Sequence, residues 1–305
     1  MNNFHSSLVF ILSIFSGALF FESCISSEKI DENTQKNEKL NEDTNNLQNE
    51  IRYGRQLAGK LIKYFGLLNN IRASKYVNNV GNYLARQSQF TNQKFMFEIL
   101  NSDSINAFSC PGGYIFITKG ALVHIQNEAE LAMVLSHEII HVGNKHMLQT
   151  LEQNQSQKKE KIQKDDNFLN ARKRPDVQQN KVNEQLSKFL IGSSGSGLSL
   201  IEGLQQGVSL MFRVGFDKSL EFEADKLGLQ IAVNSGYNPI AIRDFFLRLN
   251  HNKSEKFKIL SKTHPPVTDR LTHIAKDLLI YEENNTYGVR VENRYKKNIN
   301  FERRL

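Results

Sequence analysis

His137 and His141 stand four residues apart in the segment HEIIH. On a helix, residues four apart differ by about 40° in azimuth and about 6 Å in rise, so both imidazoles face one point. Two converging imidazoles are what a tetrahedral zinc ion requires of two of its ligands. Glu138 lies about 100° around the helix from His137, where its carboxylate can take a proton from a water on the metal. The spacing predicts zinc bound by His137 and His141, with Glu138 as the catalytic base.

A catalytic zinc ion needs a third protein ligand and one open position. The extended pattern H-E-x-x-H-x-x-G-x-x-H would supply a histidine, but Gly143 comes one place early and Met147 stands where that histidine would be. The ligand is therefore expected from a later helix. Glu221 and Asp225 are four apart and share a face there. Glu221 is predicted to bind zinc, and Asp225 to accept the other ring N–H of a ligand histidine, which fixes its tautomer.

The expected cofactor is one Zn²⁺ per chain. Glu223 lies on a different helix face from Glu221 and is expected to be exposed. Five further histidines have no companions of this kind and are expected to be structural or on the surface: His5, His124, His146, His251 and His273.

Two helices must position the predicted ligands. Asn127 stands three residues before Glu130, ahead of an apolar-periodic run, which is a capping-box arrangement. The helix that follows is predicted to run to about Met147, and a second covers about 218–234. Apolar residues at helical spacing also predict helices over 55–87 and 240–249. The β-rich runs 95–100 and 114–118, with turn residues at 110–113, indicate strands and a hairpin. The pattern predicts an α+β fold, mostly helical, with a small sheet.

The N-terminus carries an apolar run from Leu8 to Phe21. As a helix it would rise about 21 Å, short of the roughly 30 Å hydrocarbon core, which fits a secretory signal at 1–23. Ser23 followed by Cys24 is similar to a bacterial lipoprotein processing site, so Cys24 is the lipidation candidate. The first seven residues hold no Lys or Arg, and a single anchoring helix or ordinary cleavage stay as alternatives. We expect export to the periplasm, with a lipid or signal anchor in a bacterial membrane.

The rest of the chain divides by composition. Residues 24–50 are polar and are expected to be a disordered tether. A folded domain is predicted over 51–276, with a mobile polar insertion at 150–184, a Gly/Ser-rich gating segment at 192–207, and a C-terminal tail at 277–305. Lipidation of Cys24 would leave Cys110 unpaired, so no disulfide framework is expected.

The chain has a formal net charge of +7. An excess of basic residues is compatible with binding to nucleic acid or to a membrane surface. However, the sequence contains no zinc-finger, helix-turn-helix or aromatic RNA-binding signature. A solvated basic surface is expected, and no nucleic-acid partner.

Together, the quoted residues resemble the HtpX/BepA-like zinc metallopeptidase family, which also contains the CaaX prenyl protease. The resemblance covers roughly 51–276 and rests on four segments: NAFSCPGGYIFITKGAL, NEAELAMVLSHEIIHVGNKH, SLEFEADKLGLQIAVNSGYNP and THPPVTDR. It implies a gluzincin-like fold with a small sheet beside the zinc helix. In contrast to some family members, no bilayer-spanning helix is expected after residue 21, and a type without a helical-repeat domain is expected.

Several site roles follow from this resemblance alone. From the residues alone, His264 is expected to be a loop residue. The resemblance places it near the metal, either stabilising the oxyanion or occupying the fourth zinc position in a closed form. Arg270 is implied to orient this segment or to contact substrate. The substrate strand is implied to include Ala107, Phe108, Gly112 and Gly113.

The function predicted from these features is zinc-dependent endopeptidase activity on unfolded or misfolded cell-envelope proteins. The substrate is expected to bind as an extended strand beside the edge over 107–118. The insertion and the Gly/Ser-rich segment are expected to gate the cleft. An envelope chaperone or adaptor with a structural or latched zinc site is the alternative, and a hydrolase of non-peptide substrates is a second. Glu138 argues for the peptidase, because a purely structural site has no use for it.

Overall fold

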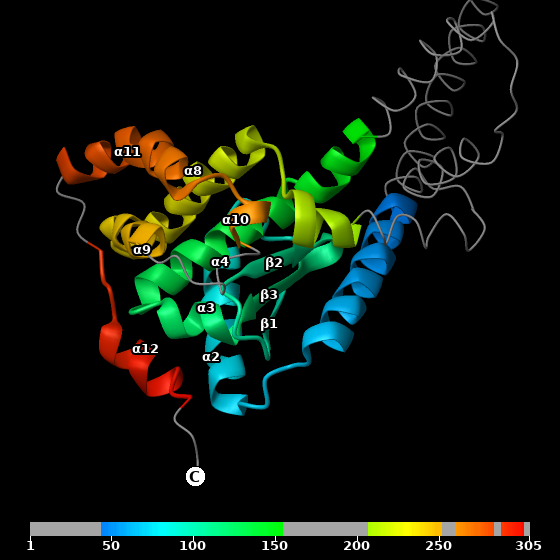
Figure 1. The fold of residues 1–305 in the computed structure, drawn as a ribbon, viewed down its shortest axis with the longest axis horizontal. Coiled ribbons are helices and arrows are strands. Elements are labelled where there is room, and N and C mark those ends of the chain that lie inside the picture. Colours follow the sequence, from blue (N-terminus) through cyan, green and yellow to red (C-terminus); the bar gives the residue numbers. More distant parts are fainter. Residues whose placement is uncertain (1–43, 155–206, 252–259, 284–287, 302–305) are drawn as a thin grey trace, which may run out of the picture. The chain divides into compact units, whose positions relative to one another are not determined.

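The computed structural model of the 305-residue chain describes residues 44–154, 207–251, 260–283 and 288–301 (Figure 1). The predicted signal peptide, Cys24 and nearly all of the insertion and gating segment lie outside these ranges. The chain divides into a unit Met1–Gln48 and a unit Asn49–Leu305, and all described residues except 44–48 lie in the second. None of the helices in the described ranges is long and apolar enough to cross a bilayer.

The described elements include helices over 44–65, 146–154 and 207–209. The labelled elements are α2 (Ile71–Arg86), β1 (Met96–Leu100), β2 (Ala107–Cys110), the 3₁₀ turn η1 (Pro111–Gly113), β3 (Tyr114–Thr118), α3 (Lys119–His124), α4 (Glu128–Gly143), the π-helical turn η2 (Leu210–Val214), α8 (Lys218–Asn234), α9 (Ile240–His251), α10 (Leu260–Thr263), α11 (Val267–Glu283) and α12 (Glu292–Asn298).

The three strands form one small sheet in the order β1-β3-β2, with β1 parallel and β2 antiparallel to β3. Alternate side chains face opposite sides, as the period of a strand requires. On β3, Ile115 and Ile117 pack in the core with α2 and α4, whereas Phe116 packs with Tyr53 and Leu57 of the helix over 44–65. The predicted strands and hairpin are therefore present, and helices cover both faces of the sheet.

Helix α4 carries the HEIIH motif and begins at the predicted cap. The Asn127 side chain accepts the amide N–H of Glu130 at 3.1 Å, and the Glu130 carboxylate accepts the amide of Gln126 at 2.9 Å. In Figure 1, α4 lies between the strands and the pair α8 and α9, and it packs on β2, β3, α8 and α9. Its motif side chains are therefore buried on every side.

The motif helix does not run to Met147 as predicted. It ends at Gly143, Lys145 adopts a left-handed φ of 56°, and a new helix starts at residue 146. After this break, Met147 and Leu151 lie in the core cluster that also contains Tyr53, Leu57 and Phe116.

Helix α8 covers the predicted range and crosses α4 at close distance. A Cβ placed on Gly228 would lie 2.9 Å from the amide nitrogen of His137. Glycine at this position therefore lets the two backbones approach, which brings the acidic face of α8 onto the motif.

Two of the predicted domain boundaries, at residues 50 and 276, lie within helices of the structure. The segment assigned to the tether is helical from residue 44, and Glu50 is buried. Residues beyond 276 include the end of α11 and all of α12, on which Tyr295 is buried and donates to the Leu122 carbonyl at 2.6 Å. The first and last described helices are therefore part of the packing. The fold class predicted from sequence, α+β and mostly helical with a small sheet, is confirmed.

Candidate active site

The structure brings His137, His141 and Glu221 together. One ligand-capable atom from each lies within 4.8 Å of the others, and all three residues are buried. The Nε2 atoms of the histidines are 2.9 Å apart. The Glu221 carboxylate oxygens lie 3.6 Å from Nε2 of His137 and 3.5 Å from Nε2 of His141. Donor atoms bound to a tetrahedral zinc ion at its usual bond lengths lie about 3.3 Å apart, close to these separations.

The surroundings of the Glu221 carboxylate indicate whether a cation fits between these three residues. Its side chain has no exposed area, and neither carboxylate oxygen has a hydrogen-bond partner. Burial raises the pKa of Glu221 to about 8, against the lowering effect of His137 and Arg270. A buried carboxylate without a partner is strongly unfavourable unless a positive charge faces it. Two imidazoles with one carboxylate form a zinc donor set, so these residues fit Zn²⁺.

Asp225 holds His137 from the side away from that donor set. Its Oδ1 lies 3.0 Å from Nδ1 of His137, which donates because a carboxylate only accepts. This bond leaves Nε2 of His137 unprotonated and facing Glu221. Burial alone would lower the pKa of His137, but the hydrogen bond and charge of Asp225 raise it.

Arg270 lies behind Asp225. Its Nε donates to Asp225 Oδ2 at 2.8 Å, a second guanidinium nitrogen donates to Oδ1, and its Cζ lies 4.4 Å from the ring centre of Phe246. This charge holds the pKa of Asp225 well below its usual range, although burial opposes it. Arg270 therefore contacts Asp225, which in turn holds His137, and it also lines a cavity beside Glu138.

His141 contacts His146, a residue that the sequence analysis expected to be structural or on the surface. Its Nδ1 lies 2.9 Å from Nδ1 of His146, and His146 has 1% exposed area. Burial, with the nearby His137, lowers the pKa of His146 to about 4, so its ring is neutral at pH 7. If Nε2 of His141 faces the metal, Nδ1 carries the proton and donates to His146. Nε2 of His146 then carries a proton and faces the Glu223 carboxylate at 3.8 Å.

Glu138, the residue after His137 on α4, lies close to the same group of side chains. It is buried, and burial raises its pKa, while His137 and a hydrogen bond with Ser109 of β2 act in the opposite direction. A general base works best with a pKa near the operating pH, so a raised value suits the predicted role.

His264 follows α10 and joins the same group. Atoms of His137, Glu138 and His264 lie within 4.8 Å of one another, and Nε2 of His264 is 3.7 Å from Glu221. Burial lowers the pKa of His264 well below its usual value, so its ring is neutral. This position is compatible with either role implied for it.

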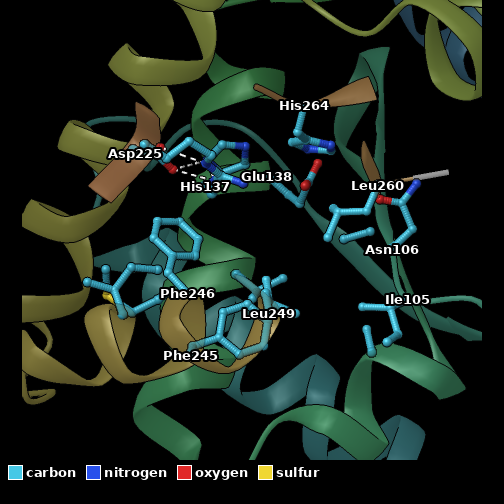
Figure 2. A pocket seen from close by; sticks show the side chains of 16 residues that line it. Ile105, Asn106, His137, Glu138, Asp225, Phe245, Phe246, Leu249, Leu260 and His264 are labelled. Atoms are coloured by element: carbon cyan, nitrogen blue, oxygen red, sulfur yellow. Dashed lines mark hydrogen bonds and ion pairs between the residues drawn. The ribbon is translucent and has the colours of Figure 1, made fainter. Parts of the chain in front are cut away.

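A cavity of about 50 Å³ opens beside Glu138. Figure 2 shows Glu138, His264 and Asn106 bordering one part of it, and Phe245, Phe246 and Leu249 the other. A second cavity of about 30 Å³ lies between β2, Glu138, Phe216 and His264. Helix α4, strand β2 and the α10 end therefore surround the catalytic candidates.

The predicted substrate-strand residues separate into two groups. Ala107 lines both cavities and Phe108 lines the smaller one. Gly112 and Gly113 line neither; they form the turn after β2 with φ values of 76° and 100°. A Cβ on Gly113 would lie 2.0 Å from the Lys94 carbonyl oxygen, so the need for glycine there is conformational.

Sequence reasoning missed three residues near the motif. His146 and Ser109 contact His141 and Glu138, and Asn106 lines both cavities. Asn106 begins one of the family-like segments, NAFSCPGG, which was the available signal. His146 had none, because five residues along an unbroken helix would face it away from His141.

Comparison with known proteins gives consistent results. The sequence model of Peptidase family M48 matches residues 72–277. The beta-barrel assembly-enhancing protease of Yersinia pestis is 30% identical over 207 residues, 65% of this chain and 37% of that protein. The protein of the same name from Escherichia coli (strain K12) is 27% identical over 221 residues, 72% of this chain and 41% of that protein. The mitochondrial metalloendopeptidase OMA1 of Arabidopsis thaliana is 25% identical over 191 residues, 61% of this chain and 33% of that protein. The chain spans about two fifths or less of the length of these relatives.

Proposed function

Because the chain belongs to peptidase family M48, we propose that it is a zinc-dependent metalloendopeptidase that hydrolyses peptide bonds of unfolded or misfolded cell-envelope proteins. The observation that carries the proposal is the buried Glu221 carboxylate, which has no hydrogen-bond partner and faces two histidine nitrogens. Three relatives named as proteases or endopeptidases support the reaction class.

His137, His141 and Glu221 hold the metal in this proposal. When bound, Zn²⁺ supplies Lewis-acid polarisation of a carbonyl and lowers the pKa of water. Glu138 takes one proton from the attacking water as its oxygen bonds to the scissile carbon. Glu138 then passes that proton to the amide nitrogen as the C–N bond breaks, so one water is consumed and a carboxylic acid and an amine form. His264 either stabilises the developing oxyanion or occupies the fourth metal position in a closed form.

The substrate is proposed to bind as an extended strand along β2. This strand is an edge of the described sheet, pairing with β3 on one side, and Ala107 and Phe108 bring it to the cavities beside Glu138. Main-chain hydrogen bonds along an edge strand give affinity with modest sequence selectivity, which suits unfolded substrates.

Location and gating are part of the same proposal. Export by the 1–23 segment, with Cys24 lipidated, would place the domain in the periplasm at a membrane. The names of the bacterial relatives, which refer to β-barrel assembly, are in line with an envelope role. The segments 150–184 and 192–207 connect the two ligand helices and are proposed to gate the cleft. Deletion of 152–182 is then expected to raise basal turnover; unchanged turnover with zinc retained would argue against gating.

A chaperone or adaptor with a structural zinc site is the second candidate. A structural site has four protein ligands, and the candidate for the fourth is His264, whose Nε2 lies 3.7 Å from Glu221. The peptidase candidate requires Glu138 for peptide-bond hydrolysis, whereas the chaperone candidate has no role for Glu138.

The deciding experiment is cleavage of casein by the purified protein, with and without a chelator, with bound zinc quantified. Glu138→Gln is the matched variant, because it keeps the side-chain shape and removes the base. We expect chelator-sensitive cleavage that is lost in Glu138→Gln with zinc retained. Zinc-loaded protein that does not cleave casein would favour the second candidate, unless His264→Ala restores cleavage, which would identify a latch.

A further inference from the structure

The ring of Phe216 lies against one face of the His141 imidazole. Phe216 directly precedes Asp217, the N-cap of α8, and the two ring centres are 4.5 Å apart with 25° between the ring planes. His141 has 3% exposed area, whereas Phe216 is half-buried and packs on the core cluster that contains Tyr53 and Leu57. A stacked aromatic ring thus covers one face of a candidate zinc ligand.

The histidine contacts of His141 act on its nitrogen atoms. Its Nδ1 lies 2.9 Å from Nδ1 of His146, and its Nε2 lies 2.9 Å from Nε2 of His137. The ring planes of these two histidines make angles of 80° and 72° with that of His141, so neither lies flat on it. Contacts at the two nitrogens do not restrain the tilt of the ring about the line that joins them. A ring stacked on the face restrains that tilt, and among the described residues Phe216 is the one in stacked contact with His141.

The main chain on both sides of Phe216 is closely held, which fixes the point from which the ring starts. Gly215 has a left-handed φ of 74°, and a Cβ placed on it would lie 1.9 Å from the carbonyl oxygen of Thr263. On the other side, the Asp217 carboxylate accepts the amide N–H of Ser219 at 2.8 Å and its hydroxyl at 2.7 Å. The ring is therefore pre-organised, and a pre-organised group loses less entropy when a ligand binds.

A stacked phenyl ring interacts more strongly with a metal-bound imidazole than with a neutral, metal-free one. The face of an aromatic ring carries negative charge density and attracts a nearby cation. An imidazole bound to Zn²⁺ shares part of the charge of the ion, whereas a neutral imidazole carries none. An interaction that is stronger in the metal-bound state than in the metal-free state raises the affinity for the metal.

We infer that Phe216 is a positioning residue of the zinc site: its ring fixes the plane of the His141 imidazole and stabilises that imidazole further once it shares the charge of the metal. The inference rests on the donor set of the proposed function and adds to it a residue that has no ligand atom. Aromatic pairs contribute, beyond burial, an amount that corresponds to about 2- to 13-fold in an equilibrium constant. The effect on zinc affinity should fall in that range.

The test measures the zinc Kd of the full-length protein at pH 7 by competition with a chelator. Phe216→Leu keeps an apolar side chain and removes the ring face, so we expect a Kd about 3- to 10-fold above that of the wild type. The absorption bands of the Co²⁺-loaded variant should also shift, because the tilt of one ligand ring changes. Phe216→Tyr retains the ring and should bind zinc as the wild type does.

Phe222→Leu is the matched control. Phe222 lies on α8 and stacks on the His273 ring of α11 at 4.3 Å with 10° between the planes, so the variant removes a phenylalanine–histidine stack of the same kind. His273 lies outside the donor set, so the zinc Kd and the Co²⁺ bands should be unchanged. If Phe216→Leu does not fold, Phe216→Met removes the ring at the same position with a more flexible side chain.

The outcomes separate the inference from the proposed function, because zinc binding is measured without turnover. An unchanged zinc Kd in Phe216→Leu, or an equal loss of affinity in Phe222→Leu, would overturn the inference and leave the peptidase proposal standing. A lower Tm of the metal-free Phe216→Leu protein with an unchanged Kd would likewise overturn it, since the ring would then serve packing only. A wild type that binds no zinc would overturn both.

Discussion

Replacing His146 with alanine tests whether the hydrogen bond behind His141 contributes to metal binding. The contact joins two buried Nδ1 atoms at 2.9 Å, and among the described residues His146 is the hydrogen-bond partner of the His141 Nδ1. Loss of a group that orients a ligand histidine lowers metal affinity about 10–100-fold. This range corresponds to about 1.4–2.7 kcal/mol.

The effect of His146→Ala should be smaller than that of Asp225→Ala. Asp225 accepts from His137 and also neutralises Arg270, so its removal leaves a buried guanidinium without its partner. His146 is neutral and has one ring contact with the donor set, so its loss leaves no unpaired charge.

The assay is competition for Zn²⁺ against a chromophoric chelator at pH 7, with thermal unfolding of the metal-free protein measured in parallel. His146→Gln retains an acceptor and should recover part of the affinity. His124→Ala, on α3 and outside the group of donor residues, is the control and should bind zinc as the wild type does. A zinc Kd for His146→Ala within twofold of wild type would refute the positioning role, and a loss matched by unfolding of the metal-free protein would show only a structural one.

Three further predictions concern the packing that supports the site. Gly228→Ala places a Cβ 2.9 Å from the His137 amide nitrogen, so α8 must move away from α4; we expect lower Tm and weaker zinc binding in the same variant, measured by unfolding and chelator competition. Arg270→Ala should destabilise the metal-free protein by about 3–5 kcal/mol, because it leaves the Asp225 carboxylate buried without its charge partner; denaturant unfolding at pH 7 measures this, and a loss below about 1 kcal/mol would contradict it. Glu128 accepts hydrogen bonds from two tyrosines and from Arg294, and although burial opposes them these bonds lower its pKa. A depressed folded-state pKa adds stability above the unfolded value of about 4.3 that is lost as pH falls through the folded value. Glu128→Gln should therefore be less stable than wild type at pH 7, and the gap should narrow below about pH 4.

The local chemistry of the site is predictable from the amino-acid sequence. HEIIH on a capped apolar helix requires two imidazoles on one face, and the four-residue spacing of Glu221 and Asp225 places both acids on one face of a second helix. These conclusions depend only on helical periodicity, which is local and is set by the backbone. The strands and the hairpin followed from equally local patterns, so the fold class was predictable as well.

The surroundings of these groups depend on contacts that a sequence pattern does not contain. His146 reaches His141 because the chain turns at Lys145, whose left-handed conformation no periodicity rule predicts. Asn106 has an open amide because the helices and strands around it bury the side chain without offering a partner. The approach of α8 to α4 depends on the missing Cβ of Gly228. Each of these features arises from contacts between segments distant in sequence or from one backbone reversal, and a sequence pattern carries neither.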